Sequence, residues 1–180
     1  DGQWWVVSQR TQSPSGLGYV LHNRLIVSRL FPEPFRELRV QHIASAYRRL
    51  IDTVAHQATE VAARLGDGNT PRIALLTPGP YNETYFEQSY LARYLGVTLV
   101  EGHDLTVRGQ RLYLKTLHGL EPVHGLIKRV DDAFLDPLEL RPESRLGVPG
   151  LLQAVRAGNL LVANAPGAAV LESSALLGFI

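Results

Sequence analysis

The sequence predicts an α/β fold: a Rossmann-like, mainly parallel open sheet with flanking helices, preceded by an N-terminal β element and a long helix. Three observations predict it. One segment in the first half of the chain carries apolar residues at helical spacing over many turns. Four short apolar runs follow, and each of them ends in a polar turn. Helical patterns lie between these runs, and strands that alternate with helices pair in parallel.

Residues 4–30 are predicted to form a β-hairpin-like unit. The apolar run from Trp4 to Val7 and the apolar-rich segment from Tyr19 to Leu30 are joined by the polar stretch SQRTQSPSGLG. Within this stretch, SPSGLG is either a simple turn or a loop whose backbone amides hold an anion. The next segment, LFPEPFREL, contains two prolines and is expected to be a linker or a short turn of helix.

Residues 40–65 are predicted to form a long helix with one buried face. Apolar residues such as Ile43, Tyr47 and Val54 recur at helical spacing, and Gly66 followed by DGNTP ends the pattern. We divide the chain into a β element over residues 1–38, the long helix with its linker over 39–70, and a Rossmann-like domain over 71–180.

A βαβ unit is predicted after residue 71. RIALLTPGP is typical of a strand buried on both faces, and VTLVEG of a second one. The segment between them, NETYFEQSYLARYLG, has Asn82 as its N-cap and Gly96 as its C-terminal stop, which indicates a helix. Because the connecting loops are short, the two strands are expected to pair in parallel across this helix.

The remaining segments extend the same architecture. DLTVRGQRLYLKT alternates apolar and polar residues about Arg108-Gly109-Gln110, which indicates a hairpin. VHGLIKRV and NLLVANAPG are the third and fourth candidates for parallel strands. RPESRLGVPGLLQAVRAG is a helix between them, and AAVLESSALLGF is expected to form the last helix. The predicted strands lie near residues 73–77, 97–100, 124–129 and 160–163, and the predicted helices cover 82–95 and 146–157.

The composition is that of an ordinary globular protein, with 45% hydrophobic and 19% charged residues. The 18 Lys and Arg residues nearly balance the 17 Asp and Glu residues, so no electrostatic argument favours nucleic acid or an anionic membrane as a partner. The chain has no cysteine, which excludes disulfides and thiolate metal sites and fits a reducing compartment. No signal peptide or membrane-length apolar run is visible, and we therefore expect a cytoplasmic location.

The two ends suggest an excised piece of a longer protein. The sequence begins with Asp1, contains no Met, and stops at the apolar run ALLGFI without a polar tail. Natural domain ends are usually polar and exposed. We therefore expect the remainder of its own chain to be a partner of this segment.

The loops at the carboxyl ends of the predicted parallel strands are the candidate ligand site, because open parallel sheets bind ligands there. The first loop opens a helix, whose free amides suit a carboxylate or phosphate. Arg129 is the candidate partner of that anion, and Asp104 the candidate partner of an amine. The alternative is that Gly and Pro in these loops are only turn residues. The candidate substrate-binding residues are Tyr81, Asn82, Glu83, Asp104, Asp131 and Asn164, and Arg129 is a candidate catalytic residue.

Two charged clusters leave alternatives open. Lys128 and Arg129 close a buried strand on opposite faces, so only one of them reaches the ligand; a salt bridge from Arg129 to Asp131 or Glu139 is the competing interpretation. The second cluster is an acidic run that is either a Mg²⁺ site or a solvated loop with a capped turn. It consists of Asp131, Asp132, Asp136 and Glu139. No metal ligand is assigned, since the histidines lack ligand spacing. Walker A, G-x-G-x-x-G, G-x-S-x-G and H-E-x-x-H motifs are all absent.

Three stretches are more specific: RTQSPSGLGYVLHNR, TPGPYNETYFEQSYLARYLGVTLVEGHDL and KRVDDAFLDPLELRPESRLGVPGLLQAVRAGN. Together they resemble the circularly permuted ATP-grasp family, which is distantly related to glutathionylspermidine synthase and has many uncharacterised members. The resemblance covers nearly the whole chain. It implies a ligase that phosphorylates a carboxylate with ATP and Mg²⁺ and passes the acyl phosphate to an amine. The implied partners are small carboxylate and amine substrates or a peptide.

The resemblance also implies roles for individual residues. The segment over residues 4–24 resembles the permuted end of the ATP-grasp core, in which SPSGLG approaches a phosphate or acyl phosphate through its amides. Residues 71–167 resemble the Rossmann-like substrate domain that precedes that core. The implied phosphate-loop residues are Ser15, Gly16, Gly18, Asn23 and Arg24, with Arg10 as a second catalytic residue beside Arg129.

Two departures from the family pattern concern the metal. Gln9 stands where relatives commonly have Asp, and His22 where they have Glu, and both changes remove a carboxylate able to hold Mg²⁺. The elements that clasp adenine are expected after residue 180, so this segment alone is expected to hold no cofactor and to catalyse nothing. The alternative function is a degenerate, non-catalytic paralogue that acts as a binding or scaffolding subunit. A generic Rossmann-like nucleotide binder lacks the glycine fingerprint.

Overall fold

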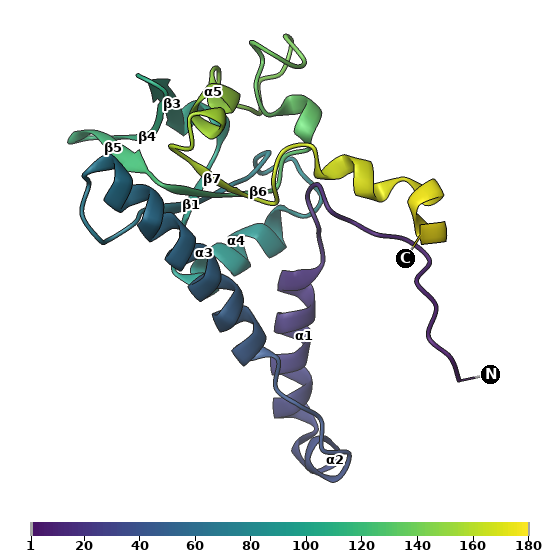
Figure 1. Cartoon of the computed structure of the whole chain (residues 1–180). Helices are drawn as coiled ribbons and strands as arrows, with labels where there is room; N and C mark the ends of the chain where they lie inside the picture. Colours follow the sequence, from purple (N-terminus) through teal and green to yellow (C-terminus); the bar gives the residue numbers. More distant parts are fainter. Residues whose placement is uncertain (1, 180) are drawn as a thin grey trace.

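A four-stranded parallel sheet forms the centre of the molecule in the computed structural model, which describes residues 2–179 (Figure 1). Its strand order is β2-β1-β6-β7, and every neighbouring pair is parallel. The predicted α/β class with a parallel sheet is therefore confirmed, and each strand lies within its predicted range. The strands are β1 (Ile73–Leu76), β2 (Thr98–Val100), β6 (Gly125–Lys128) and β7 (Leu161–Ala163).

A three-stranded antiparallel sheet, in the order β3-β4-β5, is built from β3 (Leu105–Arg108), β4 (Arg111–Thr116) and β5 (Gly119–Val123). The predicted hairpin is present: Gly109 and Gln110 both have positive φ, as a tight two-residue hairpin turn requires. Strand β5 was not predicted from the sequence. Pro122 lies within it, and proline is tolerated only at a sheet edge, which is the position of this strand.

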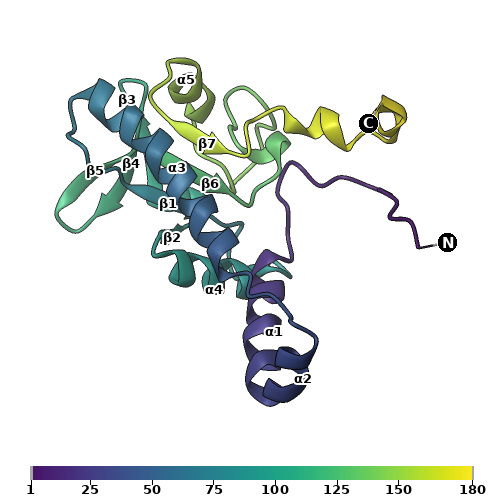
Figure 2. The same cartoon turned by 60° about the horizontal axis from the view of Figure 1, so that its bottom comes forward.

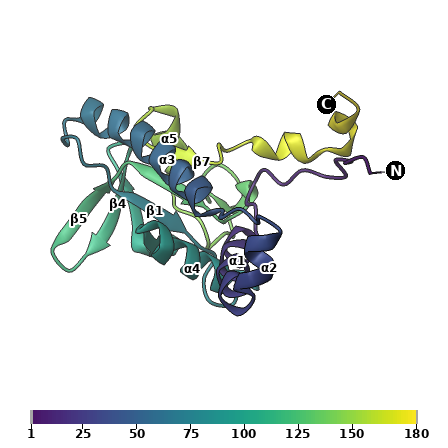
Figure 3. The same ribbon diagram turned by 90° about the horizontal axis from the view of Figure 1, so that it is seen from below.

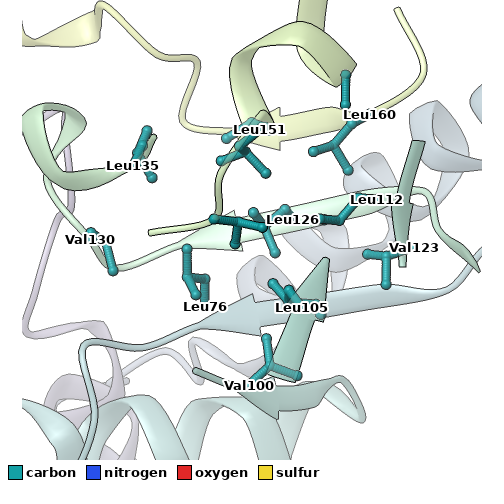
Figure 4. Packing of buried hydrophobic residues seen from close by; sticks show 14 residues of the cluster. Leu76, Val100, Leu105, Leu112, Val123, Leu126, Val130, Leu135, Leu151 and Leu160 are labelled. Atoms are coloured by element: carbon teal, nitrogen blue, oxygen red, sulfur yellow. The ribbon is translucent and has the colours of Figure 1, made fainter. Parts of the chain in front are cut away.

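The parallel sheet is covered on both faces because its side chains alternate. Leu76 and Leu126 face the antiparallel sheet and α5 (Leu151–Arg156), where they pack with residues such as Leu112 (Figure 4). Leu75 and Ile127 face the opposite way. They pack against α3 (Ala44–Leu65) and α4 (Tyr85–Leu95), and α3 runs across this face in Figure 1. The predicted long helix and the βαβ unit are thus both present, with slightly shorter helices.

The predicted β element at the N-terminus is wrong. Residues 2–16 contain no regular secondary structure, and α1 (Leu17–Leu30) is a helix followed by the short helix α2 (Pro32–Glu37). Leu17, Leu21 and Leu25 are spaced by four residues and pack with Tyr47 of α3, so the apolar period is helical and not that of a strand. Helices α1 and α2 extend away from the sheets (Figure 2). The short helix at LFPEPFREL matches one of the two predicted possibilities.

The C-terminal segment differs from the single predicted helix. It forms two 3-10 helices, η3 (Ala168–Glu172) and η4 (Ser174–Phe179), because Ser173 between them has extended backbone. Two further 3-10 turns, η1 (Gly102–Asp104) and η2 (Asp132–Phe134), follow β2 and β6. The N-terminal and C-terminal segments lie on the same side of the molecule in Figures 1 and 3. No helix among the described residues is both long and apolar enough to cross a membrane.

Candidate functional site

An N-terminal segment, residues 10–16, crosses the carboxyl edge of the parallel sheet and is held there by the loops that follow β6 and β7. Asn164 Nδ2 donates a hydrogen bond to the carbonyl of Thr11 over 2.5 Å. The ammonium of Lys128 donates to the carbonyl of Gln12, and the Ser13 hydroxyl donates to Asp131. Figure 1 shows this crossing segment passing the end of β6. The crossing segment thereby covers one side of the carboxyl edge of the parallel sheet.

Glu172 of η3 fixes the same crossing segment from the other direction. Its Oε1 accepts hydrogen bonds from the backbone N–H groups of Thr11 at 2.7 Å and Gln12 at 2.8 Å. These bonds hold the pKa of Glu172 below its ordinary value, because backbone donors stabilise the carboxylate. An ionised Glu172 therefore adds to the contacts that hold the crossing segment.

A cavity of about 300 Å³ lies between the crossing segment, the loops that follow β1 and β6, and the start of α4. Its walls are mostly polar, and they include both positive and negative side chains. It brings together six of the residues selected from the sequence: Arg10, Ser15, Asn82, Glu83, Arg129 and Asp131. Other residues complete it: Ser13, Pro78, Thr84, Gln88, Val130, Phe134 and Leu146.

Of the two adjacent cations, Lys128 and Arg129, it is Arg129 that lines this cavity. Its side chain is partly buried, and burial lowers its pKa, while the negative charge of Glu87 acts in the opposite direction. Its hydrogen bond, from Nη1 to the carbonyl of Lys128, is long at 3.3 Å. Among the described residues Arg129 forms no ion pair, so the competing salt bridge to Asp131 or Glu139 is not present.

Lys128 has the structural role. Its side chain is fully buried, and its ammonium lies 2.7 Å from Oδ1 of Asp132. The same ammonium holds the carbonyl of Gln12, and the backbone N–H of Asp132 donates to Gln12 Oε1 over 3.2 Å. Lys128 is therefore satisfied inside the protein, whereas Arg129 lacks a carboxylate partner within residues 2–179.

The first turn of the α4 region supplies a network of neutral hydrogen-bonding groups to the cavity. Asn82 Oδ1 accepts from the Thr84 backbone N–H at 3.0 Å and from Gln88 Nε2 at 3.2 Å. The prediction that Asn82 is the N-cap is wrong by two residues, because the helix begins at Tyr85 with Thr84 as its N-cap. Asn82 instead orders the turn that precedes the helix through these side-chain hydrogen bonds. Gln88, which the sequence analysis did not select, is buried and also accepts a hydrogen bond from the buried Thr77 hydroxyl.

The SPSGLG loop holds an anion, but that anion belongs to the protein. The Glu87 carboxylate, buried on α4, accepts hydrogen bonds from the backbone N–H of Gly16 at 2.7 and 2.8 Å and from that of Gly18 at 2.9 Å. The implied role of these amides in phosphate binding therefore needs correction, because an internal carboxylate already uses them. Nothing in the local sequence indicated this contact, which joins residues about 70 positions apart.

The other selected residues lie outside the cavity. Asn23 and Arg24 line a separate apolar groove between α1 and α2, and Arg24 donates to the carbonyl of Gln41 at 3.1 Å. Tyr81 is fully exposed, and Asp104 closes a capping box with Glu101 in η1. Asn164 is used to hold Thr11, as described above. The expectation that Tyr81, Asp104 and Asn164 line one concavity with Asn82 and Arg129 is therefore not met.

Three of the four acidic residues after β6 have an ion-pair or backbone N–H partner within the protein. Asp136 is buried and accepts hydrogen bonds from the backbone N–H groups of Gly150 and Leu152, each at 3.0 Å, so it caps α5. Glu139 pairs with Arg156, and Asp132 pairs with Lys128. Within residues 2–179 there is no group of three His, Asp or Glu residues placed to hold a metal ion. The side chains described here therefore do not fit a Mg²⁺-nucleotide site.

Comparisons with known proteins place these observations in a family. A sequence model described as circularly permuted ATP-grasp type 2 matches residues 1–180. The chain is 38% identical to an uncharacterised protein of Synechocystis sp. over 179 residues, covering 99% of the chain and 36% of the relative. It is 42% identical to an uncharacterised protein of Mycobacterium tuberculosis, covering 92% of the chain and 29% of that relative. A second Mycobacterium tuberculosis protein is 38% identical over the whole chain, which spans 20% of its length.

Proposed function

Because the chain belongs to the circularly permuted ATP-grasp type 2 family, we propose that it is the substrate-binding part of an ATP-dependent carboxylate–amine ligase. The observation that carries the proposal is Arg129, a partly buried guanidinium without a carboxylate partner in the described part of the chain, beside a polar cavity at the carboxyl edge of a parallel sheet. A planar guanidinium suits a carboxylate, which it binds through two parallel hydrogen bonds. Arg129 would hold and orient the carboxylate that becomes phosphorylated.

The nucleotide is assigned to another part of a longer polypeptide. The chain spans only 20–36% of the length of the relatives described above, which leaves room for a separate nucleotide site in proteins of this kind. Glu87 occupies the amides of the SPSGLG loop, and the acidic residues after β6 are engaged with other partners. These residues therefore offer no site for ATP or Mg²⁺ in our proposal, and we expect no turnover by the chain alone.

A hydroxylamine trap tests the ligase proposal in the longer protein that carries this segment. The carboxylate attacks the γ-phosphate, ADP leaves, and the acyl phosphate reacts with hydroxylamine to give a hydroxamate and phosphate. Acetate, glycine, diglycine and triglycine are the carboxylates tested, with Mg·ATP present. We expect hydroxamate with at least one of them and its loss in Arg129→Ala. Hydroxamate formation that is unchanged in Arg129→Ala contradicts the assigned site.

One observation favours the second candidate, a non-catalytic paralogue that serves as a binding subunit. The phosphate-loop amides are already used by Glu87, as expected if the loop has kept its fold and lost its ligand. His22 does not strengthen this candidate, because its ring packs edge-on against Tyr90 at 4.9 Å and is explained by packing. In the same assay, this candidate predicts that none of the four carboxylates gives hydroxamate.

A further inference from the structure

We propose that the cavity beside Arg129 binds a small zwitterion, a ligand with one carboxylate and one ammonium group, such as an amino acid or a short peptide. The proposal deepens the proposed function by naming the class of ligand, and it rests on that function only for the fate of the carboxylate. The observation behind it is that side chains of both charges line one cavity without pairing with one another.

The positive side of the cavity is formed by Arg129 and Arg10. Arg129 comes from the end of β6 and is partly buried, whereas Arg10 comes from the crossing segment and is exposed. Neither takes part in an ion pair within the described residues. A partly buried cation without an anion has lost some of its hydration in the free protein, and a ligand carboxylate offsets that cost.

The negative side is formed by Glu83 at the start of the α4 region and Asp131 after β6. Glu83 has no hydrogen-bond or ion-pair partner in the part of the chain that the structure describes, and Asp131 accepts one hydrogen bond from the Ser13 hydroxyl. Both carboxylates can accept from an ammonium group. Because the positive and negative side chains do not pair with one another, the cavity offers one position for a carboxylate and a separate one for an ammonium group.

The same charges argue against a phosphate ligand. A phosphate group would meet Arg129, but the carboxylates of Glu83 and Asp131 in the same small cavity would repel its charge. A volume of about 300 Å³ lies at the lower end of the range of about 300–1,000 Å³ typical of small-molecule sites. Ser15 and Asn82 add neutral hydrogen-bonding groups that suit a peptide bond or a polar side chain. The cavity therefore favours a compact ligand of zero net charge.

Titration of the chain with glycine compounds, without ATP, tests the inference. Glycine, diglycine and triglycine carry both charges and differ in length, so the tightest of them shows whether the ligand is an amino acid or a peptide. N-acetylglycine lacks the ammonium and glycinamide lacks the carboxylate. Binding is followed by amide chemical shifts in NMR. We expect at least one zwitterion to bind about tenfold more tightly than both singly charged compounds, since each lost charge removes a charge-assisted contact.

Two variants with matched controls locate the binding. Arg129→Gln is expected to weaken the zwitterion about tenfold or more and to remove its advantage over glycinamide. Glu83→Gln, on an exposed residue whose change leaves the fold intact, is expected to weaken it severalfold and to reduce its advantage over N-acetylglycine. Arg108→Gln on β3 and Glu33→Gln on α2 lie outside the cavity and are expected to change nothing.

Three results overturn the inference: no saturable binding of any zwitterion in the millimolar range, equal binding of N-acetylglycine or glycinamide, or no effect of Glu83→Gln and Arg129→Gln. Because the titration contains no ATP, its outcome is independent of the hydroxylamine trap. A zwitterion that binds as expected supports this inference even where the trap shows no ligase. A working ligase whose cavity prefers glycinamide or N-acetylglycine contradicts it.

Discussion

The carboxylate of Glu87 on α4 binds the backbone N–H of Gly16 through both of its oxygens, at 2.7 and 2.8 Å. One of the oxygens also accepts from the N–H of Gly18 at 2.9 Å. This contact connects the start of α1 to α4 and fixes the end of the crossing segment that forms one wall of the cavity. It explains why a glycine-rich loop that resembles an anion site is ordered by the protein itself.

Replacing Glu87 by Gln is expected to lower the free energy of unfolding by about 1–3 kcal/mol, because a buried amide group then faces backbone donors that need an acceptor. Urea denaturation followed by circular dichroism measures the change. Glu60→Gln on the exposed side of α3 is the control and is expected to change stability by less than about 0.5 kcal/mol. An equally small effect of Glu87→Gln would show that the contact does not stabilise the fold.

Gly18→Ala is expected to destabilise the protein by about 1–3 kcal/mol through overpacking. A Cβ atom at position 18 would lie 2.7 Å from the backbone oxygen of Glu87, and backbone atoms cannot move aside cheaply. Gly178→Ala is the matched control, because a Cβ atom there meets nothing within 4 Å. The two variants are compared by thermal unfolding. Equal melting temperatures would contradict the close approach of α1 to α4.

The neighbouring cations are expected to respond differently to the same substitution. Lys128→Met breaks a buried ion pair with Asp132 and should cost about 3–5 kcal/mol of unfolding free energy. Arg129→Met removes a cation without a carboxylate partner among the described residues and should leave stability within about 1 kcal/mol of the original, or raise it. Chemical denaturation of both variants measures this. A loss as large for Arg129→Met as for Lys128→Met would show that Arg129 serves the fold and not a ligand.

The attachment of the crossing segment is expected to weaken in acid. The folded-state pKa of Glu172 is lowered by the N–H donors of Gln12 and Thr11, so the stabilisation is complete above the unfolded-state pKa of about 4.3 and is lost as pH falls through the lower folded-state value. Amide chemical shifts of Thr11 and Gln12 should report this transition below pH about 4.3. In Glu172→Gln the transition should vanish. Amide shifts that stay constant throughout acidification would contradict the contact.

The parallel sheet could be predicted from the sequence because short apolar runs such as IALL and GLIK are buried on both faces and stand between clear turn residues. The N-terminal β element was wrong because Leu17, Leu21 and Leu25 form a helical stripe within a segment that is apolar at many other positions as well. The apolar run at Trp4 and Trp5, read as a strand, is exposed and has no partner strand within residues 2–179.

The candidate site could be predicted in part. Asn82 and Arg129 lie at the carboxyl ends of parallel strands, and this topology alone brings them into one cavity. Three other determinants, Glu87, Gln88 and the crossing segment, were missed because their contacts join distant parts of the chain. The bond between Asn164 and Thr11, for example, spans 153 positions and follows no periodic pattern. Such contacts depend on the assembled fold and not on local sequence.

The central claim is that Arg129 presents a free guanidinium to a ligand carboxylate, and its side-chain resonance tests this most directly. The Nε–Hε signal of Arg129, assigned in NMR spectra by its loss in Arg129→Gln, is followed while diglycine is added to the chain. We predict a saturable shift of this signal, together with the amides of the loops that follow β1 and β6. An Arg129 signal that stays unmoved while diglycine saturates another surface, or while nothing saturates at all, would contradict the account.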